Sequence, residues 1–160
     1  MGIKKILLNT HYLKNKIKNY LSENKFNVSI DIIDDGEQIL DTGGGITNMI
    51  NSTDEENFLI LNPDTLWDFN YLACIREMDE FFANSKIKNI LLVVNKKLSF
   101  DKKLIGDFNL QNNQLTKNTN NEYIYTGCQI FSRDLLNSST KKVFSIIEIW
   151  NALIEKNSLF

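Results

Sequence analysis

Two features of this sequence combine residue types that can bind ligands. Thr42 is followed by three consecutive glycines, Gly43, Gly44 and Gly45, and Asp64 stands just after an apolar run. Glycines leave the backbone bare, so a flat base or a phosphate can reach main-chain amides. A carboxylate at the end of a strand is a natural ligand for Mg²⁺, which prefers one or two carboxylates together with phosphate oxygens. The two features together favour a phosphorylated ligand and its cation.

Each feature also has a plainer interpretation. A short glycine run is commonly a simple turn, and a lone aspartate after a strand is at least as often a helix cap or a solvated turn residue. Asp34 and Asp35 follow another apolar run and are expected to form a solvated turn. His11 is expected to be a helix-start residue without a catalytic role.

The elements that must position these residues follow from the apolar pattern. Alternating or continuous apolar runs predict strands at residues 4–9, 28–32, 58–61, 87–94 and 123–131. Helical spacing predicts helices near residues 13–21, 71–82 and 144–154 and another that begins at Ile46. Three consecutive glycines do not fit the interior of a regular element, so residues 43–45 are predicted to precede that helix as a loop.

The alternation of strands and helices predicts an α/β fold with a mostly parallel, Rossmann-like sheet flanked by helices. The wholly apolar run at residues 58–61 is typical of a central parallel strand buried on both faces. Two short runs around Gln-Asn-Asn-Gln at residues 111–114 predict a late antiparallel hairpin. Without a repeat or linker, residues 1–160 are predicted to form one domain.

Composition excludes several classes of function. The 18 basic and 20 acidic residues are spread along the chain, so no basic face is available for nucleic acid. Cys74 and Cys128 are far apart and His11 has no cysteine near it, which argues against a disulfide framework or a zinc site. The apolar start is too short for a signal peptide or a membrane span, so we expect a cytoplasmic protein.

The order of several motifs resembles bacterial sugar-1-phosphate nucleotidyltransferases. Leu40-Asp41-Thr42-Gly43-Gly44-Gly45 and Asn62-Pro63-Asp64 are similar to the Leu-Glu-Thr-Gly-Gly-Gly and Asn-Gly-Asp motifs of that family. Further matches in family order are Asn9-Thr10-His11-Tyr12-Leu13, Gly106-Asp107-Phe108, Tyr125-Thr126-Gly127 and the Phe144-Ser145 to Trp150 stretch. The branch that the chain resembles most comprises N-acetylmuramate-1-phosphate uridylyltransferases and mannose-1-phosphate guanylyltransferases.

The resemblance implies a reaction and a role for each matched residue. A sugar-phosphate oxygen attacks the α-phosphorus of a nucleoside triphosphate, and pyrophosphate leaves. Thr42, Gly43, Gly44 and Gly45 would belong to the nucleotide site, and Asp64 would bind Mg²⁺ beside the α-phosphate. Four further residues would border the sugar phosphate, namely Gly106, Asp107, Thr126 and Gly127. The implied partners are thus a nucleoside triphosphate and a sugar 1-phosphate.

The chain departs from the family pattern at both ends. Family members open with a strand and a glycine-rich loop whose arginine and lysine hold the triphosphate, and they continue to a second metal-binding aspartate. This chain begins at what resembles the second strand, so we expect it to need a separately encoded N-terminal fragment or to be inactive. Two alternatives stay open: a receiver-like, magnesium-binding regulatory module built on Asp34, Asp35 and Asp64, and a remnant that binds no ligand.

Overall fold

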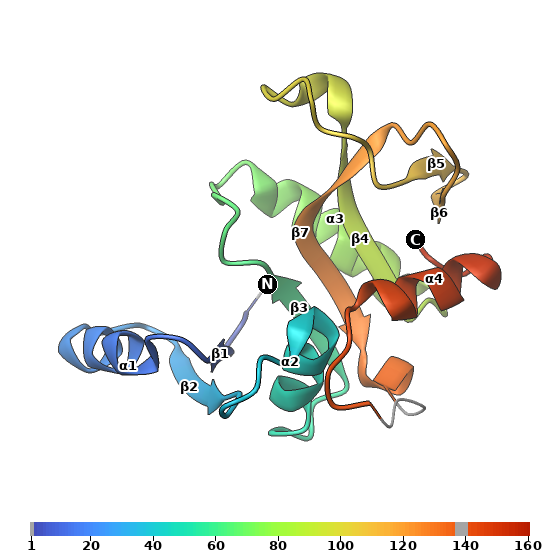
Figure 1. Ribbon diagram of the computed structural model, residues 1–160. Coiled ribbons are helices and arrows are strands. Elements are labelled where there is room, and N and C mark those ends of the chain that lie inside the picture. Colours follow the sequence, from blue (N-terminus) through green and yellow to red (C-terminus); the bar gives the residue numbers. More distant parts are fainter. Residues whose placement is uncertain (1, 137–140) are drawn as a thin grey trace. The chain divides into compact units, whose positions relative to one another are not determined.

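The computed structural model describes residues 2–136 and 141–160. The chain forms two compact units (Figure 1): unit 1 comprises Met1–Glu55 and Ser138–Glu148, and unit 2 comprises Glu56–Asn137 and Ile149–Phe160. That residues 1–160 form a single domain stays a prediction.

Unit 1 is built on a pair of parallel strands. Strand β1 (Lys5–Thr10) pairs with β2 (Ser29–Asp34) in register from Lys5 opposite Ser29 to Thr10 opposite Asp34. Helix α1 (Lys14–Glu23) connects the two strands, because parallel neighbours need a crossover. Both strands and the helix lie where the apolar pattern predicts them.

The second helix of unit 1 corrects one prediction. Helix α2 spans Asp41–Ile50, so Gly43, Gly44 and Gly45 lie inside its first turns and do not form a loop before Ile46. None of the three glycines has a positive φ. The low helix propensity of glycine is overridden here by contacts with another segment of unit 1, which also bind amides of the first turn.

Unit 2 contains a three-stranded sheet in the order β3–β7–β4, with β7 between its neighbours (Figure 1). Strand β7 (Tyr123–Ser132) runs antiparallel to both β3 (Asn57–Leu61) and β4 (Asn89–Asn95). The prediction that residues 58–61 form a central parallel strand is therefore wrong, since β3 pairs antiparallel with β7 and is only partly buried. A continuous apolar run does not specify the direction of the neighbouring strand. The α/β class, with parallel and antiparallel parts, is confirmed.

Two helices cover opposite faces of this sheet. Cys128 and Ile130 of β7 pack with Ile75 and Met78 of α3 (Tyr71–Asn84). Because side chains alternate along a strand, Gln129 points to the other face, where α4 (Ile147–Glu155) contributes Trp150. Trp150 is buried, and so are Phe108, Phe131 and Phe144, whereas Phe69 and Phe100 are almost fully exposed.

The predicted hairpin is present in unit 2. Strands β5 (Asn109–Gln111) and β6 (Gln114–Thr116) pair antiparallel, and Asn112 and Asn113 between them have φ values of 52° and 61°. Two central residues with positive φ are typical of the type I′ turn that suits hairpins. Short 3-10 turns follow β4 at Lys96–Leu98 and β7 at Arg133–Leu136. Over the residues described, no helix is long and apolar enough to cross a bilayer.

Candidate functional site

The loop that carries Asp64 is held against β7. The Asn62 amide donates to the Gly127 carbonyl over 2.7 Å, and the Thr65 hydroxyl donates to the Thr126 carbonyl over 2.9 Å. Gly127 has a φ of +87°, and a Cβ there would lie 2.8 Å from Thr65 Oγ1. Only glycine fits this backbone, so the structure explains Gly127 by the close approach of the Asp64 loop.

Asp64 itself is exposed, and its carboxylate takes part in no hydrogen bond or ion pair with the described residues. It is therefore available as a ligand for a hard cation. Within residues 2–136 and 141–160 there is no group of three or more acidic, histidine or cysteine side chains that could hold a metal ion. The donor set fits Mg²⁺ bound through one carboxylate and the phosphate oxygens of a ligand.

Gly106 and Asp107 precede β5 and lie beside the first residues of β7. The Asp107 amide donates to the Tyr123 carbonyl over 2.7 Å, and the Asp107 carboxylate accepts from the Tyr125 amide over 2.9 Å. A Cβ on Gly106 would collide with the Asn121 carbonyl oxygen. Asp107 thus contacts the residue that precedes Thr126, and the structure brings the Asp64 loop, Thr126, Gly127 and Asp107 together along β7.

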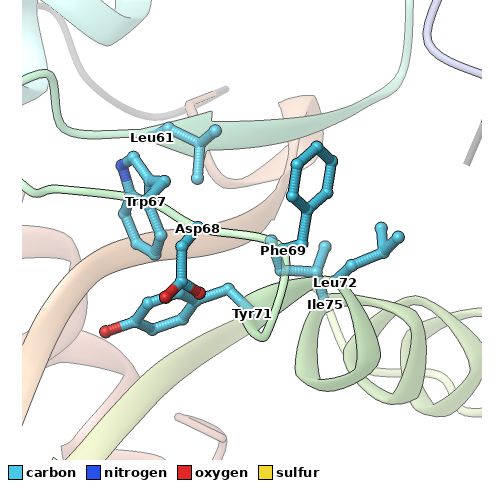
Figure 2. Close-up of a pocket in the computed structure, with 7 residues that line it drawn as sticks. All are labelled: Leu61, Trp67, Asp68, Phe69, Tyr71, Leu72 and Ile75. Carbon is cyan, nitrogen blue, oxygen red and sulfur yellow. The ribbon is translucent and has the colours of Figure 1, made fainter.

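A cavity of about 330 Å³ follows the Asp64 loop, between the end of β3 and the start of α3 (Figure 2). Figure 2 shows Trp67 and Phe69 on either side of Leu61, with Asp68 and Tyr71 below them. The indole of Trp67 donates to the Asn62 carbonyl over 3.3 Å and meets Tyr71 edge-on, at 5.0 Å between ring centroids. The sequence motifs predict no site here, and the only sequence signal for this cavity is the closely spaced aromatic residues Trp67, Phe69 and Tyr71.

The glycines of α2 contact another segment of unit 1. The Gly43 and Gly44 amides both donate to the Phe144 carbonyl, over 2.9 and 3.1 Å, and the Thr42 hydroxyl accepts from the Ile146 amide over 3.0 Å. A Cβ on Gly43 would collide with the Phe144 ring, and one on Gly44 with the Lys142 carbonyl oxygen. The Phe144 carbonyl thus binds two amides of the first turn, which a helix otherwise leaves unpaired.

This packing changes the interpretation of the glycine run. Gly43 and Gly44 are required by the close approach of residues 142–146, and their amides are bound to protein and not free for a base. The nucleotide-binding role of Thr42, Gly43, Gly44 and Gly45 stays a prediction. Asp64 belongs to unit 2 and the glycines to unit 1, so contact of one ligand with both also stays a prediction.

The turn after β2 is not simply solvated, which corrects a second prediction. Asp35 is only 9% exposed, and its carboxylate accepts from the side-chain amides of Asn9 at 2.8 Å and Asn48 at 2.9 Å. Asp34 is at the surface, where the hydrogen bond from Lys14 and a second one from the Gly36 amide lower the pKa of its carboxyl group. Burial had no sequence signal here, because two adjacent aspartates are far more often solvated.

His11 lies between β1 and α1 and not within the helix. Its Nδ1 is 2.9 Å from the Gly36 carbonyl oxygen. Because a carbonyl can only accept, Nδ1 carries the proton in this contact. His11 therefore joins the ends of β1 and β2.

Known structures share this arrangement of elements. HddC from Yersinia pseudotuberculosis superposes with a TM-score of 0.69 over 91% of this chain at 18% identity, and it has also been solved in complex with GMP-PN. The inositol-1-phosphate CTP transferase from T. maritima reaches a TM-score of 0.76 over 99% of the chain at 13% identity. The fold is the nucleotidyltransferase fold.

A UDP-glucose pyrophosphorylase complexed with UDP-glucose shows the same nucleotidyltransferase fold, with a TM-score of 0.68 over 97% of this chain and 10% identity. The chain spans 63% of the length of HddC, 66% of the T. maritima transferase and 70% of the pyrophosphorylase. No family model and no curated protein sequence matches it.

Proposed function

We propose that this chain takes part in transfer of a nucleoside monophosphate from a nucleoside triphosphate to a sugar 1-phosphate. The observation that carries the proposal is the Asp64 loop, which presents a free carboxylate while its backbone is bound to Thr126 and Gly127 of β7. Asp107 lies against the same strand at Tyr125. The nucleotidyltransferase fold supports this use of the loop.

The proposed reaction is a displacement at phosphorus. An oxygen of the sugar phosphate donates a lone pair to form a bond to the α-phosphorus, while the bond from the α-phosphorus to the bridging oxygen breaks and its electron pair leaves on pyrophosphate. Mg²⁺, when bound, neutralises phosphate charge. Asp64 would hold the cation, and Gly106, Asp107, Thr126 and Gly127 would border the sugar phosphate. The protein's contribution would be positioning and charge neutralisation, since no covalent intermediate is needed.

The motif resemblance points to two substrate pairs. These are UTP with N-acetylmuramate 1-phosphate and GTP with mannose 1-phosphate, and either product would be a nucleotide sugar of the kind used in cell-wall or surface glycan synthesis. The test is to incubate the purified full chain with Mg²⁺ and each pair and to follow pyrophosphate release. Nucleotide binding, or pyrophosphate release above that of the uncatalysed mixture with either pair, would support the proposal, and the absence of both would contradict it.

Asp64→Asn tests the role of the carboxylate. Removing this carboxylate should lower Mg²⁺-dependent activity on the order of 100-fold or more. Asp79→Asn is the matched control, because it removes one carboxylate from an exposed position on α3 of the same unit. Equal activities of the two variants would show that Asp64 does not hold the cation.

A non-catalytic remnant is the second candidate, and one observation favours it. The Gly43 and Gly44 amides, which the resemblance assigns to the nucleotide, are bound to Phe144. Titration with UTP, GTP or dTTP, followed by the fluorescence of Trp67 beside the Asp64 loop, separates the two candidates.

The receiver-like alternative is disfavoured because Asp35 is bound by two amides and Asp34 by Lys14. It predicts labelling of Asp64 by acetyl phosphate, which the nucleotidyltransferase proposal does not.

A further inference from the structure

We propose that Asp35 is the positioning residue of helix α2, and that with Asn9 and Asn48 it fixes this helix on the carboxyl ends of β1 and β2. The proposal deepens the proposed function, because α2 carries the residues assigned to the nucleotide. Its structural part concerns unit 1 alone.

The three side chains come from three different elements. Asn9 is near the carboxyl end of β1, Asp35 directly follows β2, and Asn48 is in α2. The Asp35 Oδ2 atom accepts from Asn9 Nδ2 at 2.8 Å, and its Oδ1 atom accepts from Asn48 Nδ2 at 2.9 Å. The Asn48 amide also reaches the Asp34 carbonyl, at 3.2 Å. One carboxylate therefore joins both strands to the helix.

The hydrogen bonds of this network restrict the position of α2. Asp35 is 9% exposed, and both of its side-chain partners are neutral amides. The neighbouring cation, Lys14, pairs with Asp34. A carboxylate held away from water needs donors at defined positions around its oxygens, and the loss of one donor is costly. A packed apolar contact would tolerate sliding of the helix, whereas these two hydrogen bonds would not.

Gly45 shows that the helix lies close to this network. A Cβ on Gly45 would be 3.0 Å from Asn9 Nδ2 and 3.8 Å from Asp35 Oδ2. Gly45 and Asn48 are three residues apart, so they share one face of α2. This face is the one that meets Asn9 and Asp35. The third glycine of the run is thus explained by the same network, just as Gly43 and Gly44 are explained by residues 142–144.

Helix α2 is consequently held at two places within unit 1. The Phe144 carbonyl binds the amides of its first turn, and Asp35 binds Asn48 near its other end. Shifts of about 1 Å in a group that positions a substrate can cost about 10²-fold in rate. Asp35 would act in this way through α2, without touching the nucleotide.

An exchange of side chains between positions 9 and 35 tests the hydrogen-bond geometry. In Asp35→Asn the side chain keeps only one acceptor for two amide donors, and in Asn9→Asp two carboxylates face each other. The double variant N9D/D35N restores both bonds, because an amide at position 35 can donate to position 9 and accept from Asn48. Asp31→Asn is the control, since it removes a carboxylate of β2 that pairs with Lys5 at the surface.

The primary measurement is amide hydrogen exchange of α2 in the absence of ligand. We expect exchange in α2 to become about tenfold faster or more in each single variant and to return toward the wild-type rate in the double variant, with D31N unchanged. If a single variant does not fold, folding of the double variant would show the same restoration of the two hydrogen bonds. Unchanged exchange in D35N, or a double variant no better than D35N, would overturn the proposal.

The link to function has a separate readout. Where the wild-type chain binds a nucleotide, its affinity should fall in D35N and recover in N9D/D35N. If exchange follows this pattern while the wild-type chain binds no nucleotide, the proposed function fails and the positioning of α2 by Asp35 stands. If the chain binds nucleotide equally well in all variants, Asp35 does not position α2 for the ligand and the proposal is overturned.

Discussion

For single residues, two explanations of the glycine run predict opposite effects of Gly44→Ala on the free energy of unfolding. If Gly44 faced a ligand groove, Gly44→Ala would stabilise the ligand-free protein by about 1 kcal/mol, because alanine is the better helix former. In the structure a Cβ at this position collides with the backbone oxygen of Lys142. We therefore expect Gly44→Ala to destabilise the ligand-free protein by about 1–3 kcal/mol or more, as overpacking does.

Chemical denaturation followed by circular dichroism measures this change in the free energy of unfolding. Asn19→Ala in helix α1 is the control, because it makes a favourable change of helix propensity at an exposed position of the same unit. If Gly44→Ala were as stable as the control variant, the result would favour the explanation in which the glycine run faces a ligand.

At the scale of elements, the sequence predicted what depends on local pattern and missed what depends on contacts between distant segments. The strands and the hairpin follow from apolar runs and from the Asn112-Asn113 turn, and all are found. The start of α2 was misplaced because its first-turn amides bind Phe144, a partner about 100 residues away in the chain. The antiparallel direction of β3 and the burial of Asp35 were missed for the same reason. Of the candidate site, the loop at Asp64 and the strand residues Thr126 and Gly127 could be placed from the sequence, but their hydrogen bonds could not.

The C-terminal residues act as an element that joins two strands of unit 2. The Leu115 amide of β6 donates to the Leu159 carbonyl, and the Leu91 amide of β4 donates to the Phe160 carbonyl. The Leu159 side chain is fully buried. Leu159→Ala should therefore lower the free energy of unfolding by about 2–5 kcal/mol, as for other buried leucines. Leu98→Ala, at a position that is 77% exposed, should change it by less than about 0.5 kcal/mol. Urea titrations that gave equal midpoints for the two variants would contradict the structural role of the C-terminal segment.

For the whole molecule, the side chains that can be used to follow unfolding are distributed unevenly between the two units. Both tryptophans, Trp67 and Trp150, and both cysteines belong to unit 2, so fluorescence and thiol labelling follow that unit alone. Cys74 is exposed and Cys128 is buried. A thiol reagent should label one cysteine in the native protein and two in denaturant, and labelling of both in the native state would show that β7 opens.

The buried groups of β7 also determine how stability changes at alkaline pH. Burial raises the pKa of the Cys128 thiol from 9.0 to about 12, and burial likewise raises the pKa of Tyr125 above its ordinary 10.0. Between pH 9 and 12 the unfolded chain releases a thiol proton that the folded chain retains, so the free energy of unfolding falls as pH rises. The stabilisation is fully present below pH 9.

Cys128→Ala should weaken this pH dependence of the free energy of unfolding and Cys74→Ser should not, as measured by urea denaturation with tryptophan fluorescence from pH 8 to 10.5. Deprotonation of the lysines is common to all three proteins. The difference in how steeply the free energy of unfolding falls with pH therefore isolates the contribution of Cys128. An equal pH dependence for wild type and Cys128→Ala would show that this thiol is not shielded from water in the folded state.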